Sequence, residues 1–416
     1  MLYFDKRRIF IKCTCVLRGG WSFSNFSILH SKKKKRVFKY IEIMEVIVSG
    51  TEQCAIVEIG DLVRRLTLET GQEYLALNRG INAVVNIDLS EVVKSIDFNS
   101  PEIQIYPPTT GFPALKDAIN QEFFRGQANP ANISITGGGM AAIDMAFQTV
   151  KVDKVYVPEV IWESYFMIMQ MRGKRPGLYH SLSSLKGMID ELRGNAVLIC
   201  DPSNPVGDKY DDAKLFDLIK FLNDNGVVVF CDCPYRRIFK GAEDDFYERI
   251  LPLENVVITE SFSKSVGLSG MRLGFIHSIN PLFNKEILLR LLFATNGING
   301  FAQQLVLRLL TTEEGKKAVA DFKQKTVEGI TKNIAYLREK GFLAEEFYQE
   351  STPVGIFTIL KMTYDELMKH RIASVSLRFF AKEMEGADKY SRICVSIPYE
   401  KLRSFFEPLE GLVSSK

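Results

Sequence analysis

The stretch Ser261-Phe-Ser-Lys264-Ser-Val-Gly-Leu-Ser-Gly-Met-Arg272-Leu-Gly274 sets one lysine and one arginine eight residues apart, among small hydroxyl residues and glycines. A short apolar run of the β type, Asn255–Thr259, leads into it, and another, Leu273–His277, follows it. Burial at the rim between two strands would lower the pKa of such a lysine, which makes its amine a nucleophile toward an aldehyde. Arginine presents a fork of N–H groups suited to a phosphate. The stretch therefore predicts a site for a molecule that carries both an aldehyde and a phosphate.

Three further segments show the same pattern, in which an apolar strand ends in polar residues or glycines. They are Ser134–Ile143, which contains three successive glycines, Asp201–Gly207, which follows the apolar run Ala196–Cys200, and Val227–Tyr235, which ends in Asp-Cys-Pro-Tyr. In this order, and together with the lysine stretch, they resemble the signature segments of the class I/II aminotransferases of fold type I, the aspartate aminotransferase-like superfamily. The resemblance covers roughly residues 70–400 and implies pyridoxal 5'-phosphate as the cofactor.

Short apolar runs alternate with helical patterns through the middle of the chain, which favours a mostly parallel sheet covered on both faces. In such sheets ligands bind at the carboxyl ends of the strands. The resemblance implies an α/β fold with a large domain, built on a mostly parallel seven-stranded sheet between helices, and a smaller α+β domain. The expected strands are 155–158, 196–200, 227–231, 256–259 and 274–277, and helices are expected at 59–70, 212–223, 301–310 and 314–340.

The change from alternating strands to long helices near residue 300 indicates a second domain. We expect residues 44–95 to form the N-terminal part of the small domain, residues 96–295 the large cofactor-binding domain, and residues 296–416 the rest of the small domain. Residues 74–80 are predicted to form a short strand that runs into a turn.

The first 43 residues differ from the rest, because they hold eleven Lys and Arg residues against two acidic ones. The whole chain has a net charge of +3, so the remainder is acidic. Such a segment is typical of a solvated, non-functional extension. We expect that it is translated from an upstream start and that the protein proper begins at Met44. A transit peptide and a patch for anionic surfaces or nucleic acid remain alternatives.

The resemblance gives Lys264, Asp232 and Tyr235 the catalytic roles. Lys264 would form the Schiff base with the cofactor and move the proton during turnover. Asp232 would pair with the pyridine nitrogen and keep it protonated, so that the ring accepts electrons. Tyr235 and Asn204 would hydrogen-bond the ring's phenolate oxygen, although an Asn-Pro pair such as Asn204-Pro205 also marks turns on its own.

The remaining cofactor contacts concern the phosphate and the face of the ring. Residues Gly138, Gly139 and Met140 would open a helix whose free N–H groups suit an anion. Ser261 and Arg272 would add side-chain donors, and Trp162 would stack on the pyridine ring.

Substrate contacts are implied for Arg392, Gly80 and Asn204, with Arg392 gripping the α-carboxylate in a bidentate manner. Tyr106 resembles a tyrosine that reaches the cofactor phosphate of a neighbouring subunit, which implies a homodimer. Arg290 lies near a position that contacts side-chain carboxylates in dicarboxylate-specific relatives, but the local match is poor.

Composition sets the remaining bounds. The apolar and charged fractions, 46% and 25%, are ordinary for a globular protein, and no window has the length and purity of a membrane span. Seven cysteines and four scattered histidines suggest neither a disulfide scaffold nor a metal site. We therefore expect a cytoplasmic protein with no nucleic acid and no membrane as partner. The resemblance implies that its small-molecule substrates are an α-amino acid and a 2-oxo acid.

Four functions are compatible with these residues. Transamination is favoured, but decarboxylation and Cα–S β-elimination use the same lysine, aspartate and phosphate cup, because the cofactor performs the difficult step. A non-catalytic regulator on the same fold is the alternative from another class.

Overall fold

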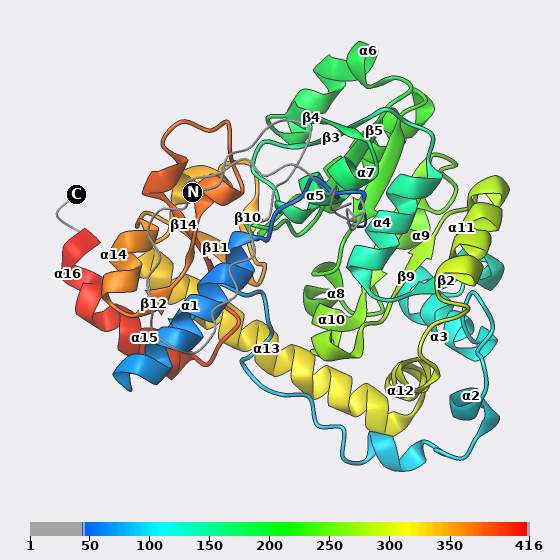
Figure 1. The fold of residues 1–416 in the computed structure, drawn as a ribbon, viewed down its shortest axis with the longest axis horizontal. Helices are drawn as coiled ribbons and strands as arrows, with labels where there is room; N and C mark the ends of the chain where they lie inside the picture. Colours follow the sequence, from blue (N-terminus) through cyan, green and yellow to red (C-terminus); the bar gives the residue numbers. More distant parts are fainter. Residues whose placement is uncertain (1–43, 45, 414–416) are drawn as a thin grey trace, which may run out of the picture. The chain divides into compact units, whose positions relative to one another are not determined.

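The computed structural model describes Met44 and residues 46–413, and its largest sheet has seven strands (Figure 1). The strands follow the order β2-β9-β8-β7-β5-β3-β4. All neighbours are parallel except those of β9, which is antiparallel to both β2 and β8. Their bounds are β2 Ile133–Thr136, β3 Lys154–Pro158, β4 Arg175–Tyr179, β5 Ala196–Cys200, β7 Val228–Asp232, β8 Val256–Ser261 and β9 Gly274–His277. The predicted mostly parallel α/β sheet is confirmed. The basic extension predicted for residues 1–43 lies outside the described residues.

The inner strands form where the sequence offers runs of apolar residues. Every residue of β5 and of β8 is buried, as expected for strands covered on both faces. The edge strand β4 has no such signal, because Pro176 and Gly177 stand inside it. Gly177 is required there, since a Cβ would lie 2.5 Å from the Tyr156 ring of β3.

Helices pack against this sheet, with α4 on β8 and β9 and α7 on β7. Polar side chains cap the N-termini of several helices. Asp211 accepts a hydrogen bond from the Lys214 N–H at the start of α7, and Thr312 accepts one from the Gly315 N–H at the start of α13. The longer helices are α1 Ala55–Thr70, α3 Pro113–Phe124, α4 Gly139–Thr149, α5 Ser164–Met171, α7 Asp212–Asp224, α11 Pro281–Ala294, α12 Gly300–Thr311, α13 Glu313–Glu339 and α15 Tyr399–Phe406. The shorter ones are α2 Pro101–Gln104, α6 Ile189–Leu192, α8 Arg236–Phe239, α9 Phe246–Ile250, α10 Phe262–Ser265, α14 Tyr364–Lys369 and α16 Glu410–Val413.

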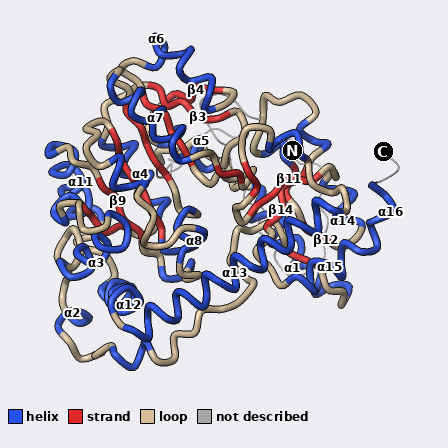
Figure 2. Tube along the Cα trace, turned by 180° about the vertical axis from the view of Figure 1, so that it is seen from behind, coloured by secondary structure: helices blue, strands red, loops and turns tan. Residues whose placement is uncertain are grey.

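A second group of strands brings the segment at residues 75–76 next to segments after residue 350. Figure 2 shows α13 extending between the two groups of strands. Three strands form an antiparallel sheet in the order β11-β14-β13, and two pairs stand apart, β1 with β12 and β6 with β10. The bounds are β1 Leu75–Ala76, β6 Asp208–Lys209, β10 Thr352–Pro353, β11 Phe357–Leu360, β12 Ile372–Ala373, β13 Val375–Ser376 and β14 Ser391–Cys394. The domain boundaries given above stay a prediction.

Candidate active site

A cavity of about 280 Å³ opens beside the carboxyl ends of β7 and β8, the edge at which the sequence places the site. Eleven of the thirteen predicted site residues line it: Gly80, Gly139, Met140, Trp162, Asn204, Asp232, Tyr235, Ser261, Lys264, Arg272 and Arg392. A larger cavity of about 1350 Å³ lies between α7 and α13, and no predicted site residue lines that one.

The other two predicted residues are placed differently. Gly138 lies just behind the wall of the cavity, where a Cβ would come within 2.7 Å of the Arg272 guanidinium. Tyr106 follows α2 and leaves 81% of its surface exposed, away from the cavity lining of its own chain. Its predicted role in a neighbouring subunit stays a prediction.

Lys264 lies on α10, immediately after β8, and its Nζ donates a hydrogen bond to the Gly80 carbonyl. Burial lowers the pKa of its amine to about 8, from an ordinary value near 10.5. At neutral pH roughly a tenth of such an amine is uncharged, against about one part in 3000 for an ordinary lysine. Lys264 is thus able both to attack a carbonyl carbon and to exchange protons near neutral pH.

This lowered pKa can be tested on the protein without cofactor. Competitive acetylation of Lys264 should rise with pH and reach its half-point near pH 8, because only the neutral amine reacts. Mass spectrometry after labelling at a series of pH values measures this, with a lysine-containing peptide as the reference. A half-point near that of the peptide would mean that the amine is not desolvated.

The segment 78–82 holds Lys264 and Arg392 in place. Asn82 donates from Nδ2 to the Lys264 carbonyl at 2.8 Å and accepts a hydrogen bond from Ser396 Oγ at 2.7 Å. The Asn78 carbonyl accepts a hydrogen bond from Arg392 Nη2. Gly80 thus makes a direct contact with Lys264, and its expected contact with substrate stays a prediction.

Asp232 closes β7 and is buried at the floor of the cavity. Burial raises the pKa of its carboxyl to about 6, although hydrogen bonds from Tyr165 and Thr259 oppose that rise. The Thr259 hydroxyl donates to Oδ1 at 2.8 Å, and the Tyr165 hydroxyl donates to Oδ2. A buried carboxylate held by fixed hydrogen-bond donors suits pairing with a protonated ring nitrogen. The N–H of such a ring would compensate the carboxylate for part of the hydration that it loses on burial.

Sequence reasoning missed both of these hydroxyl partners of Asp232. Thr259 is the register partner of Asp232 on the neighbouring strand, so alignment of the two strand ends could have identified it. Tyr165 lies three residues after Trp162, and the two rings meet edge to face with their centroids 5.3 Å apart. The aromatic wall of the cavity is therefore a pair of rings.

Asn204 and Tyr235 occupy the next part of the wall. Asn204 follows β5 and donates from Nδ2 to the Tyr235 hydroxyl oxygen at 3.4 Å. Both side chains are buried, and the phenol and the amide provide polar groups to the same cavity.

The turn before α4 forms a cradle for an anion. Gly138 has φ +98°, which favours glycine, and a Cβ on Gly139 would lie 3.2 Å from that of Ser261. The first N–H groups of α4 are free of helical partners. Arg272 donates to the Ser269 carbonyl at 2.8 Å, and it has no carboxylate partner in the described part of the chain. Arg272 and the start of α4 together suit a phosphate.

Arg392 lies on β14 and has no exposed surface. Its guanidinium lies over the rings of Phe357 and Phe380, at 4.3 and 4.9 Å from their centroids. It donates to Asn204 Oδ1 at 3.4 Å, but its Nε has no hydrogen-bond partner, and no described carboxylate pairs with it. Burial lowers its pKa to about 10, so the group is still a cation at neutral pH. A buried cation without a counter-charge is costly, so this cavity favours an anionic ligand.

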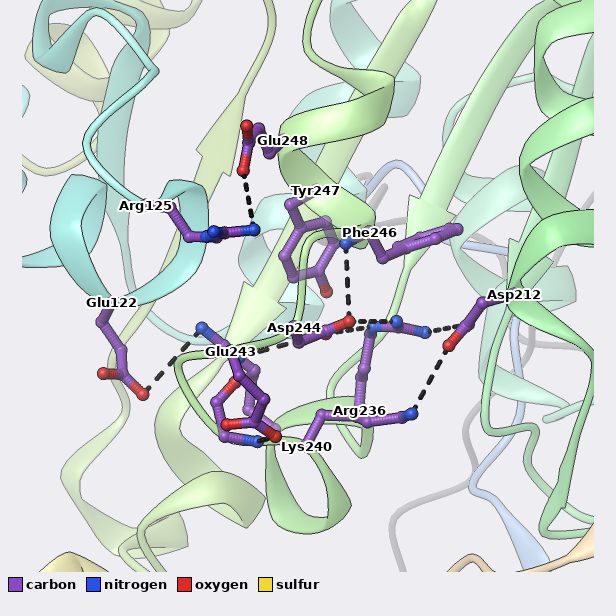
Figure 3. Close-up of polar contacts among 12 residues, drawn as sticks. Glu122, Arg125, Asp212, Arg236, Lys240, Glu243, Asp244, Phe246, Tyr247 and Glu248 are labelled. Carbon is purple, nitrogen blue, oxygen red and sulfur yellow. Dashed lines mark hydrogen bonds and ion pairs between the residues drawn. The ribbon is translucent and has the colours of Figure 1, made fainter.

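A buried ionic cluster surrounds Arg236, the first residue of α8 (Figure 3). Arg236 is fully buried and donates to both oxygens of Asp244, at 2.7 and 2.5 Å, and to Asp212 Oδ1 at 2.7 Å. Burial raises the pKa of Asp212, but hydrogen bonds from Arg236 and Lys209 outweigh it and hold that pKa below its usual range. The cluster fixes the start of α8, and Tyr235, the residue just before this helix, lines the cavity.

Comparisons with known proteins agree with this geometry. The family model described as "Aminotransferase class I and II" matches residues 73–408. An aspartate aminotransferase of Pyrococcus horikoshii is 24% identical over 53% of this chain and 59% of its own length. A histidinol-phosphate aminotransferase of Bacillus cereus is 29% identical over 57% of this chain and 60% of its own length. The matched part spans about three fifths of these relatives.

The fold recurs in solved structures. The aspartate aminotransferase from Thermus thermophilus with maleate superposes with a TM-score of 0.75, at 17% identity, over 89% of this chain and all of that one. At this identity the similarity concerns the fold, and it agrees with the seven-stranded sheet described above.

Proposed function

Because this chain belongs to the aminotransferase class I and II family, we propose that it moves an amino group between an α-amino acid and a 2-oxo acid. The observation that carries the proposal is one cavity lined by both Lys264, an amine with a pKa of about 8, and Arg392, a buried cation without a counter-charge. The first suits carbonyl chemistry near neutral pH, and the second suits a substrate carboxylate.

Pyridoxal phosphate is the cofactor of this family, and the lining residues fit its four functional groups. Lys264 would take its aldehyde carbon, and Asp232 its ring nitrogen. Its ring oxygen would face Asn204 and Tyr235, and its phosphate the cradle of Ser261, Arg272 and the start of α4. When bound, the cofactor supplies the electron sink that stabilises a carbanion at the substrate α-carbon.

The chain's own residues would perform the remaining tasks. Arg392 would hold the α-carboxylate and so orient the α-hydrogen toward Lys264. The neutral amine of Lys264 would take that proton, because its pKa lies near the working pH. The aromatic pair Trp162 and Tyr165 would shield one face of the cavity from water.

Replacing Arg392 by alanine should weaken amino-acid binding by about 100-fold, close to 3 kcal/mol, because a bidentate charge-assisted contact is lost. Cofactor affinity should change by less than about threefold by the same arithmetic. Spectroscopic titrations of the variant with cofactor and with amino acid measure the two affinities separately. Equal loss of both would make Arg392 a structural residue.

The activity itself is tested by an absorbance scan of the cofactor-loaded protein with a panel of amino acids. Conversion to the pyridoxamine form by one amino acid, reversed by a 2-oxo acid, would establish transamination. Release of CO₂, or of pyruvate without that conversion, would establish decarboxylation or elimination instead. Absence of any cofactor band would favour the non-catalytic alternative.

We further propose a homodimer and a cytoplasmic location. Ile105 and Tyr106 expose 65% and 81% of their surfaces on the loop after α2, which suits contact with a second copy. Cys200, Cys231, Cys233 and Cys394 are free and buried, as is usual for a reducing compartment. None of the described helices is long and apolar enough to cross a membrane. Light scattering of the purified protein tests the dimer.

A further inference from the structure

Arg79 lines the candidate active site, but none of the roles given above uses it. It lies between β1 and Gly80, one residue before the carbonyl that accepts the Lys264 hydrogen bond. Its side chain is exposed and makes no hydrogen bond and no ion pair with the described residues. A free guanidinium at the mouth of the cavity is available to a ligand.

The adjacent helix leaves room for this side chain. Gly60 lies inside α1, and a Cβ there would come within 3.2 Å of both Nε and Nη2 of Arg79. Glycine is among the poorest helix formers, so the sequence gains nothing locally from it at that position. The same helix contributes Ile56 to the cavity lining. The Arg79 guanidinium therefore lies between α1 and the cavity.

The charges that line the cavity are unbalanced. Four cations, Arg79, Lys264, Arg272 and Arg392, face one carboxylate, Asp232. In the proposed function the last three cations are matched by the cofactor's aldehyde, its phosphate and the substrate's α-carboxylate. Arg79 has no counterpart in a neutral amino acid, so the excess positive charge points to a second anion on the substrate.

We propose that Arg79 is a specificity-determining residue that binds the side-chain carboxylate of a dicarboxylic amino acid. This inference rests on the proposed function and deepens it. The planar fork of arginine matches a carboxylate with two parallel hydrogen bonds. The cavity of about 280 Å³ must also hold the cofactor and is at the small end for ligand sites, which favours a short side chain.

Arg290, which the sequence analysis considered for contact with a side-chain carboxylate, lies outside the cavity of its own chain. It lies on α11, donates to Gln148 Oε1 at 3.4 Å, and does not line the cavity. Within one chain Arg79 is the better placed of the two.

The test compares two unreactive ligands of four carbons, succinate and butyrate, which differ by one carboxylate. In the cofactor-loaded protein, Arg79→Gln should lower the ratio of succinate to butyrate affinity by roughly 10- to 100-fold, the range expected for one charge-assisted contact. Arg79→Lys keeps the charge but loses the forked guanidinium. Its ratio of succinate to butyrate affinity should lie between those of the wild-type protein and Arg79→Gln. Arg65→Gln is the matched control, because it removes an exposed arginine of α1 that does not line the cavity. An unchanged ratio in Arg79→Gln would overturn the proposal.

Turnover separates this inference from the proposed function. The ratio of kcat/KM for aspartate or glutamate over alanine should fall by a similar factor in Arg79→Gln. If the wild-type protein transaminates alanine at least as well as the acidic amino acids, the assignment of Arg79 fails while transamination stands. If no amino acid is transaminated, the proposed function fails, but the binding ratio still tests Arg79. A loss confined to O-phosphoserine would assign Arg79 to a phosphate and overturn the carboxylate assignment.

Discussion

Replacement of Lys264 by alanine should lower transamination by roughly 10⁴-fold or more, because one side chain serves as both nucleophile and proton carrier. The cofactor should still bind through the phosphate cradle and Asp232, but without a covalent link. Reduction with borohydride followed by mass spectrometry measures that link directly. The thermal midpoint of the protein without cofactor should not fall, because the substitution removes a buried amine whose charge burial disfavours.

Lys116 provides the matched control for this substitution. It is also a lysine whose pKa burial lowers, but it lies on α3 and does not line the cavity. Lys116→Ala should therefore keep both the covalent link and turnover. A cofactor that remained covalently attached in Lys264→Ala would show that another residue forms the bond.

Replacement of Asp244 by alanine should destabilise the fold by about 3 to 5 kcal/mol, because it leaves the Arg236 guanidinium buried with only part of its counter-charge. Arg236 loses its two hydrogen bonds to Asp244, while Asp212 still accepts one at 2.7 Å. Urea unfolding at constant protein concentration measures the change. Because Arg236 directly follows Tyr235, cofactor affinity should fall as well.

The exposed ion pair between Asp190 and Arg193 is the comparison for the buried pair of Arg236 and Asp244. Its two atoms lie 2.9 Å apart, but the Asp190 side chain is 91% exposed, so Asp190→Ala should change stability by less than about 1 kcal/mol. Similar small losses in both variants would mean that the cluster around Arg236 adds little to stability.

The sequence predicts the strands and helices where a local signal exists. The apolar runs at 196–200 and 274–277 became β5 and β9 with those bounds, and the helix expected at 212–223 became α7, one residue longer. The edge strand β4 was not predicted, because proline and glycine interrupt it and its formation depends on pairing with β3. Local patterns fail where the neighbour, and not the segment, decides the conformation.

The same distinction applies to the site. The spacing of Lys264 and Arg272 predicts their chemistry, and the resemblance implies that of Asp232. The structure brings all three to one cavity. Arg79 stands in no such pattern, because Gly60 of α1, which leaves room for its side chain, approaches it only in the folded chain. Tyr165 likewise meets Asp232 across 67 residues of sequence.

The segment 78–82 has a consequence for folding. Its hydrogen bonds reach Lys264 from Gly80, 184 residues away, and Ser396 from Asn82, 314 residues away. Contacts between such distant residues close very long loops. The loss of chain entropy on closing these loops is offset only after the intervening elements have packed. Chains still folding would therefore hold the strands but not the finished cavity. Capture of the cofactor should report the last stage of folding, when the segment 78–82 has met Lys264 and Ser396.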